Sequence, residues 1–151
     1  MLDTIDRNIL RVLQQDGRIT NQDLAARSGI SPSACFDRLR KLREQGYVRD
    51  IVAILDPEKL NQSLLVFIEV ILDRTTGNVL DQFAAAVRDM PEIIECHMVA
   101  GGFDYLLKIR VQDMAAYRRL LGDSIMQMKG VRETRTYAVL EEVKYSTSLP
   151  I

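Results

Sequence analysis

The chain has 151 residues, of which 47% are hydrophobic and 27% charged, an ordinary balance that excludes a largely disordered protein. Its formal net charge of −1 argues at first against a nucleic-acid-binding protein, but the charge is unevenly distributed. Residues 1–50 contain nine Lys or Arg and seven Asp or Glu (net +2), whereas residues 51–151 contain eleven and fourteen (net −3).

Targeting and cofactor signals are weak in this sequence. No apolar run approaches the roughly twenty residues of a membrane span, and the first residues do not have the basic and then apolar pattern of a signal peptide. Cys35 and Cys96 are too few for a disulfide scaffold or a metal cage, and we expect buried free thiols. The prediction is a cytoplasmic protein with no membrane contact, cofactor or metal.

The first thirty residues predict two helices. Apolar residues recur at helical spacing from Asp3 to Gln15, and Gly17 ends this helix. Thr20 is then suited to cap a second helix that ends at Ser28 and Gly29.

Residues 31–45 predict a third helix with both ends marked. Ser31 suits the capping position, Pro32 the first helical position, and Gly46 the residue just past the end. One apolar stripe runs along this helix at i, i+4 and i+7, made of Cys35, Leu39 and Leu42.

Three helices in about 45 residues, with the last two joined by a tight turn, are typical of a helix-turn-helix, whose second helix enters the major groove of DNA. We predict phosphate contacts from Arg38, Lys41 and Arg43, and base contacts from Ser33, Phe36, Asp37 and Arg40. Ser31, at the start of this helix, is also expected to lie on the DNA-binding surface. A solvated charged face with no DNA function is the alternative for this helix taken alone.

The composition changes after Gly46. Residues Tyr47 to Leu55 are rich in β-formers and predict a strand that Asp56-Pro57 ends. We therefore divide the chain into a DNA-binding domain (1–50), a hinge strand and linker (51–62) and a second domain (63–151).

The second domain predicts alternating strands and helices. The expected elements are a strand at 64–72, a helix at 78–90, strands at 92–100 and 103–111, a helix at 113–128 and a strand at 131–143. This order is the ferredoxin-like plan, an α+β fold in which two helices cover one face of a four-stranded antiparallel sheet. Both faces of the first strand are mainly apolar, so we expect the open face to meet another subunit. Scattered surface apolar residues are the alternative.

Five stretches carry a resemblance to a known family: LDTIDRNIL (2–10), LQQDGRITN (13–21), SPSAC (31–35), GGFDYLL (101–107) and EVKYSTSLP (142–150). In order and spacing they resemble the Lrp/AsnC (feast/famine) transcription regulators. The resemblance implies a winged helix-turn-helix, a hinge strand and a C-terminal βαββαβ module of the RAM type. It also implies that this module dimerises, assembles further into tetramers or octamers, and binds amino acids.

Two positions depart from the family pattern, and both lie on the predicted reading helix. Family members often have proline where Ala34 stands and a basic residue where Asp37 stands. The resemblance therefore implies DNA binding, but it does not imply that this chain recognises the same operator sequence as its relatives.

The turn at Gly101-Gly102 is the expected effector site. Glycine lets the backbone approach a ligand closely, and the Asp104 carboxylate can pair with an α-ammonium group, although any tight β-turn needs the same residues. The resemblance implies a site between subunits that uses Met98, Gly101, Gly102, Phe103, Asp104, Met114, Tyr137, Ala138 and Val139. The adaptable side chains of Met98 and Met114 favour leucine or another apolar amino acid, unless they are ordinary core residues.

The sequence therefore predicts a transcriptional regulator that binds a pseudo-palindromic operator as a dimer and responds to an amino acid. Catalysis is not expected, because His97 is accompanied by no nucleophile pattern and no phosphate-binding glycine loop is present. A ligand-binding module that acts on another protein without DNA is the second alternative, and it would leave residues 1–46 unexplained.

Overall fold

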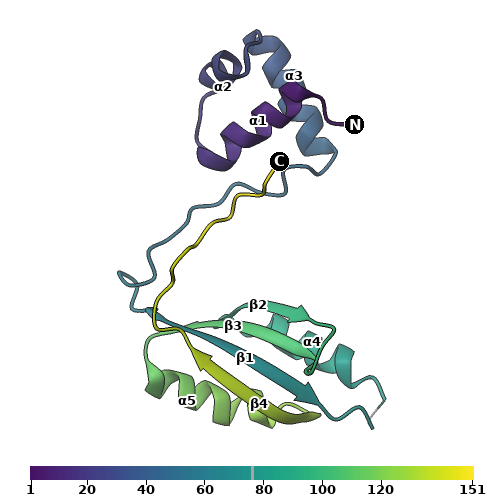
Figure 1. The fold of residues 1–151 in the computed structure, drawn as a ribbon, viewed down its shortest axis with the longest axis vertical. Coiled ribbons are helices and arrows are strands. Elements are labelled where there is room, and N and C mark those ends of the chain that lie inside the picture. Colours follow the sequence, from purple (N-terminus) through teal and green to yellow (C-terminus); the bar gives the residue numbers. More distant parts are fainter. Residues whose placement is uncertain (76) are drawn as a thin grey trace. The chain divides into compact units, whose positions relative to one another are not determined.

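The computed structural model describes residues 1–75 and 77–151 (Figure 1). Contacts divide the chain into two compact units. The first contains Met1–Ile54 together with Lys144–Ile151, and the second contains Leu55–Val143. The sequence prediction had assigned 144–151 to the second domain, whereas the structure groups this segment with the N-terminal helices.

The first unit contains the three predicted helices, α1 (Thr4–Gln15), α2 (Asn21–Ser28) and α3 (Pro32–Glu44). Each begins at a side-chain cap, because Asp3, Thr20 and Ser31 accept hydrogen bonds from free backbone amides of the first turn. Gly29 ends α2 with a φ of 68°, a left-handed conformation that glycine adopts without steric cost. The helix-turn-helix prediction is confirmed.

A small apolar core holds the three helices together. Its fully buried members are Ile9, Leu10, Leu24, Ala25, Cys35 and Leu42. The predicted stripe of α3 faces this core, with Leu39 half-buried beside it. The opposite side of α3 is consequently left in solvent.

The predicted strand over Tyr47–Leu55 is wrong. Residues 47–63 are all described, and none of them lies in a helix or strand. Val52, Ile54 and Leu55 are exposed. The strands of the described residues all belong to the sheet β2-β3-β1-β4, and residues 47–55 do not pair with it.

The second unit follows the predicted β-α-β-β-α-β order. Its elements are β1 (Leu64–Leu72), α4 (Val79–Arg88), β2 (Ile93–Met98), β3 (Tyr105–Val111), α5 (Met114–Asp123), a 3₁₀ turn (Ile125–Gln127) and β4 (Val131–Ala138). All neighbouring strands are antiparallel, in the order β2-β3-β1-β4 (Figure 1). β4 is shorter than predicted because its pairing with β1 reaches only Ala138.

The two faces of this sheet differ in composition. The covered face packs the alternate β1 residues Val66, Ile68, Val70 and Leu72 against Phe83 of α4 and Tyr117 of α5. On the open face, β1 presents Leu65, Phe67, Glu69 and Ile71. The neighbouring β3 positions are Lys108 and Arg110, which form ion pairs with Glu95 and Glu142. The open face therefore carries apolar residues along β1 and also at Leu106 of β3, which lies opposite Glu69.

Among the described residues, no helix has the length and apolar character needed to cross a membrane.

Candidate nucleic-acid interface and ligand cleft

Helix α3 presents a mixed polar and aromatic surface to solvent. Because Cys35 and Leu42 fix one side of the helix to the core, Ser33, Phe36, Asp37 and Arg40 point outward. Phe36 is 59% exposed although it is a large apolar side chain. An exposed aromatic ring between a hydroxyl, a carboxylate and a guanidinium suits contact with base edges in a groove.

The Arg40 guanidinium has only weak partners within its own helix. Its Nη2 lies 3.5 Å from Asp37 Oδ1, and its Nε lies 4.0 Å from Glu44 Oε1. Exposed pairs of this kind contribute little to stability, so Arg40 can exchange them for a nucleic-acid acceptor at small cost.

Arg38, for which a phosphate contact is predicted, pairs with two carboxylates of its own unit. Its Nη1 donates to Asp3 Oδ2 at 2.6 Å and to Asp6 Oδ1 at 2.8 Å. These two carboxylates also form the capping box of α1, so Arg38 joins α3 to the start of α1. The hydrogen bonds that Arg38 donates to the Asp3 and Asp6 carboxylates raise its pKa. Arg38 therefore ties α3 to the start of α1, and its contact with phosphate stays a prediction.

Ser31 is likewise used within the fold. Its Oγ accepts a hydrogen bond from the Ala34 amide at 3.3 Å and lies 3.2 Å from Ser33 Oγ. Lys41 and Arg43, on the exposed side of α3, remain phosphate candidates.

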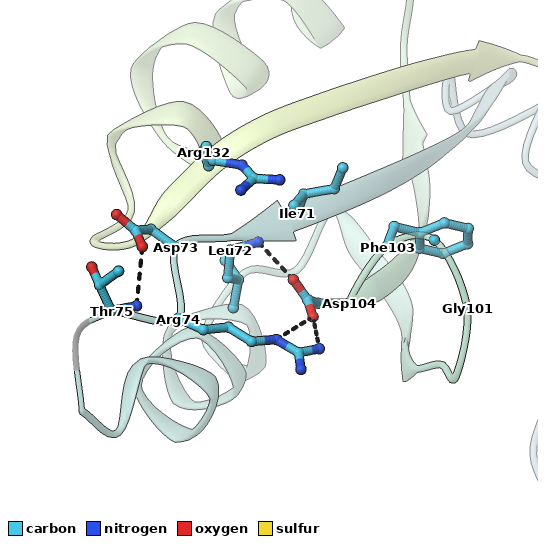
Figure 2. A pocket seen from close by; sticks show the side chains of 10 residues that line it. Ile71, Leu72, Asp73, Arg74, Thr75, Gly101, Phe103, Asp104 and Arg132 are labelled. Atoms are coloured by element: carbon cyan, nitrogen blue, oxygen red, sulfur yellow. Dashed lines mark hydrogen bonds and ion pairs between the residues drawn. The ribbon is translucent and has the colours of Figure 1, made fainter.

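A cleft of about 610 Å³ opens beside the Gly101-Gly102 turn of the second unit (Figure 2). It is lined by Ile71, Leu72, Asp73, Arg74, Thr75, Gly101, Gly102, Phe103, Asp104 and Arg132. The lining thus combines two guanidinium groups, two carboxylates and a few apolar side chains.

Asp104 is the most constrained residue of this cleft. It is 5% exposed, and its carboxylate accepts a hydrogen bond from the Leu72 amide at 2.8 Å. The Arg74 guanidinium reaches the other carboxylate oxygen through Nε at 3.0 Å and also through Nη2 (Figure 2). Burial disfavours the charged carboxylate, but the Leu72 amide and Arg74 outweigh it, so the pKa of Asp104 is lowered.

Arg74 itself is mostly in solvent. Its side chain is 71% exposed, in contrast to the buried carboxylate that it pairs with. Asp73 precedes it and accepts a hydrogen bond from the Thr75 amide at 3.0 Å. Hydrogen bonds from Thr75, and then the charge of Arg132, lower the pKa of Asp73.

Sequence reasoning missed Asp73, Arg74 and Arg132. Arg74 and Asp104 are thirty residues apart, and they meet because Val70 near the end of β1 pairs with Tyr105 at the start of β3. Arg132 joins them because β4 runs along the other side of β1. One sequence signal could have pointed to this site: Asp73 and Arg74 form a charged pair directly after β1, a strand of nine mainly apolar residues.

The predicted effector residues do not form one site within a single chain. Gly101, Gly102, Phe103 and Asp104 line the cleft at the Leu72 end of β1, whereas the remaining five residues are not among its described lining. Tyr137, Ala138 and Val139 lie toward the Leu64 end, where Ala138 pairs with Val66 and Val139 donates to the Leu65 carbonyl. Met114 begins α5 just after β3 ends at that same side.

The two groups of predicted effector residues lie at opposite ends of β1. Leu64 and Leu72 are eight steps apart along β1, or about 26 Å at the usual rise of a strand. Met98, at the end of the edge strand β2, is 62% exposed. Two ends of a sheet this far apart meet in one site only if two copies of the domain contribute to it.

Comparison with known proteins covers both units. The family model described as Lrp/AsnC ligand binding domain matches residues 65–149, and the model described as winged helix-turn-helix DNA-binding matches residues 2–49. The chain is 54% identical over 150 residues to the leucine-responsive regulatory protein of Salmonella typhimurium, covering 99% of this chain and 92% of that protein.

Solved structures agree with this match. A transcriptional regulator from Neisseria meningitidis in complex with L-Met is similar with a TM-score of 0.96 and 40% identity, covering 99% of this chain and 97% of that one. An AsnC family regulator from Agrobacterium tumefaciens is similar with a TM-score of 0.93 and 36% identity, covering 99% and 97%. These relatives are regulators rather than enzymes. This chain therefore belongs to the Lrp/AsnC family of transcriptional regulators, with a winged helix-turn-helix DNA-binding domain and an Lrp/AsnC ligand-binding domain.

Proposed function

We propose that the cleft beside Asp104 receives the charged end of an apolar amino acid, with leucine or methionine favoured. The observation that carries the proposal is the lining of this cleft, in which guanidinium and carboxylate groups lie together. Arg132 and Arg74 suit an α-carboxylate, and Asp73 and Asp104 suit an α-ammonium group. The Salmonella relative is named for its response to leucine, and the Neisseria relative was solved with L-Met.

The side chain of the amino acid needs an apolar environment. Ile71 and Phe103 supply one at the cleft. In this proposal Met114 and Tyr137–Val139 of a second copy complete the site, because these residues lie toward the Leu64 end of the sheet on their own chain. Met98 pairs with Tyr105 at the same end as the cleft, so it is proposed to contribute from the same chain. The effector then binds between subunits, and a ligand shared in this way can favour one assembly over another.

A homodimer, and from it a tetramer or octamer, is part of the same proposal. Phe67 and Ile71 form a half-buried apolar strip along β1, beside the buried Leu65, on the face that α4 and α5 leave open. Pairing two such faces buries the strip and leaves the ion pairs of β2 and β3 at its margin. Because the proposed target is DNA, we also propose a cytoplasmic location.

Direct calorimetric titration tests the effector assignment. We expect L-leucine or L-methionine to bind the purified protein, and L-leucinamide, which lacks the carboxylate, to bind at least tenfold more weakly. The physical reason is the loss of a charge-assisted pair with a guanidinium group, worth about 1.5–3 kcal/mol. Equal binding of the amide would remove the guanidinium groups from the proposed site.

For DNA, we propose that two α3 helices of a dimer read the half-sites of a pseudo-palindromic operator. Arg40 is the candidate for a bidentate contact with guanine, Phe36 for a thymine methyl group and Asp37 for a cytosine amino group, with Ser33 bonding either edge. Lys41 and Arg43 are proposed to contact phosphates.

Arg40→Ala is expected to weaken operator binding by about 1–3 kcal/mol and to relax one base position, because a bidentate base contact is lost. Fluorescence anisotropy with labelled duplexes measures the effect. Arg118→Ala is the matched control, since it removes an exposed arginine from α5 of the other unit. Unchanged affinity and base preference in Arg40→Ala would exclude this residue from the reading surface.

Salt dependence separates this function from a module that acts only on other proteins. Phosphate contacts release counterions, so the affinity for DNA should fall steeply as salt rises. Absence of DNA binding at low salt would favour the protein-only alternative.

A further inference from the structure

The outer side of α1 carries a docked peptide that comes from the other end of the chain. The Gln14 side chain makes two hydrogen bonds to the backbone of one residue: Nε2 donates to the Leu149 carbonyl at 3.1 Å, and Oε1 accepts from the Leu149 amide at 2.5 Å. One turn earlier, Arg11 Nε donates to the Ile151 carbonyl at 2.6 Å. Together these bonds engage backbone groups on either side of Pro150.

An apolar contact accompanies these hydrogen bonds. The Ile151 side chain is partly buried against the core that holds α1, α2 and α3 together. By contrast, residues 144–150 are exposed along their whole length. Docking therefore depends on three contacts. Two of them are hydrogen-bonding contacts, from the side-chain amide of Gln14 to the Leu149 backbone and from the Arg11 guanidinium to the Ile151 backbone oxygen. The third is the apolar contact of the Ile151 side chain.

The same segment is anchored again, a few residues earlier, within the ligand-binding unit. Arg110 Nη2 lies 3.3 Å from Glu142 Oε1 and 3.4 Å from Glu142 Oε2. Seven residue steps separate Glu142 from Leu149, which span at most about 25 Å. The other connection, from Gly46 to Leu64, contains seventeen intervening residues and is far longer.

We infer that α1 carries a binding surface for an extended peptide, and that the chain's own 149–151 segment occupies it as a second tether of the DNA-binding unit. The tether begins at β4, beside Tyr137–Val139, and it is the shorter of the two connections. This inference stands on the α1 contacts and does not require the identity of the effector.

Hydrogen–deuterium exchange of the full chain tests the docking, read on peptides that cover 146–151. We expect Gln14→Ala and Ile151→Ser each to make the Leu149 region exchange about tenfold faster, since each removes a separate part of the docking contact. Gln15→Ala is the matched control, because it removes the exposed neighbouring amide of α1. Unchanged exchange around the buried Ile9 shows that the helices stay folded in every variant.

The inference is overturned if the wild-type segment exchanges as fast as a free peptide, or if Gln14→Ala leaves its exchange unchanged. Amino-acid binding measured by calorimetry on the same samples reports separately on the proposed effector site. If wild-type protein binds no amino acid, the proposed function is contradicted, but the docking result still stands.

Discussion

Gly130→Ala is expected to lower the free energy of unfolding by about 2–5 kcal/mol, the sum of a left-handed backbone penalty and overpacking of a filled core. Gly130 has a φ of +88°, and a Cβ built there would lie 2.0 Å from Val79 Cγ2. Val79 is buried as the first residue of α4, so it has little room to move. The Gly130 carbonyl also accepts the Asp73 amide at 2.7 Å, which links this turn to the ligand cleft.

Chemical denaturation measures this change. Gly122→Ala is the control, because a Cβ at Gly122, inside α5, meets none of the described atoms within 4 Å. That variant should be neutral or up to about 1 kcal/mol more stable, from the better helix propensity of alanine. Equal stability of Gly130→Ala and wild-type protein would show that the turn between α5 and β4 is not built as described.

Asp104→Ala is expected to abolish the amino-acid response and to lower the free energy of unfolding by about 1–4 kcal/mol. The stability loss has two sources. The buried Leu72 amide loses its acceptor, at about 1–3 kcal/mol. The pair with Arg74 adds at most about 1 kcal/mol, because that guanidinium is largely exposed and screened by solvent.

Asp104→Asn separates folding from ligand binding. An asparagine side-chain oxygen still accepts the Leu72 amide, so most of the stability should return, while the negative charge stays absent. We expect calorimetry to detect no amino-acid binding in this variant and anisotropy to show normal DNA binding without amino acid. An intact amino-acid response in Asp104→Asn would contradict the role assigned to the carboxylate.

Local signals explain what the sequence predicted well. The ends of α3 follow from the cap Ser31, from Pro32 as the first helical residue and from Gly46 shortly after the last one. The β1 bounds, Leu64–Leu72, are predicted correctly because a short apolar run rich in β-branched residues, with polar segments on both sides, favours a strand over a helix. The ferredoxin-like order then follows from the alternation of elements.

Contacts between distant segments explain what the sequence missed. The role of Arg38 depends on where the start of α1 lies, and no spacing within α3 reveals it. Arg74 and Arg132 enter the cleft through the β1–β3 and β1–β4 pairings, which single-chain periodicity does not specify. Residues 47–55 have strand-forming composition, but a strand also needs a partner, and composition alone does not supply one.

The central claim is that an amino acid bound at the Asp104 cleft changes how the α3 helices bind DNA. Its most direct test selects duplexes from a random library with the purified protein, and then measures the affinity of the selected duplex at fixed salt with and without L-leucine or L-methionine. We predict a change in affinity of about 5-fold or more, in the usual range for coupled sites. An affinity that none of the twenty amino acids alters would contradict the account.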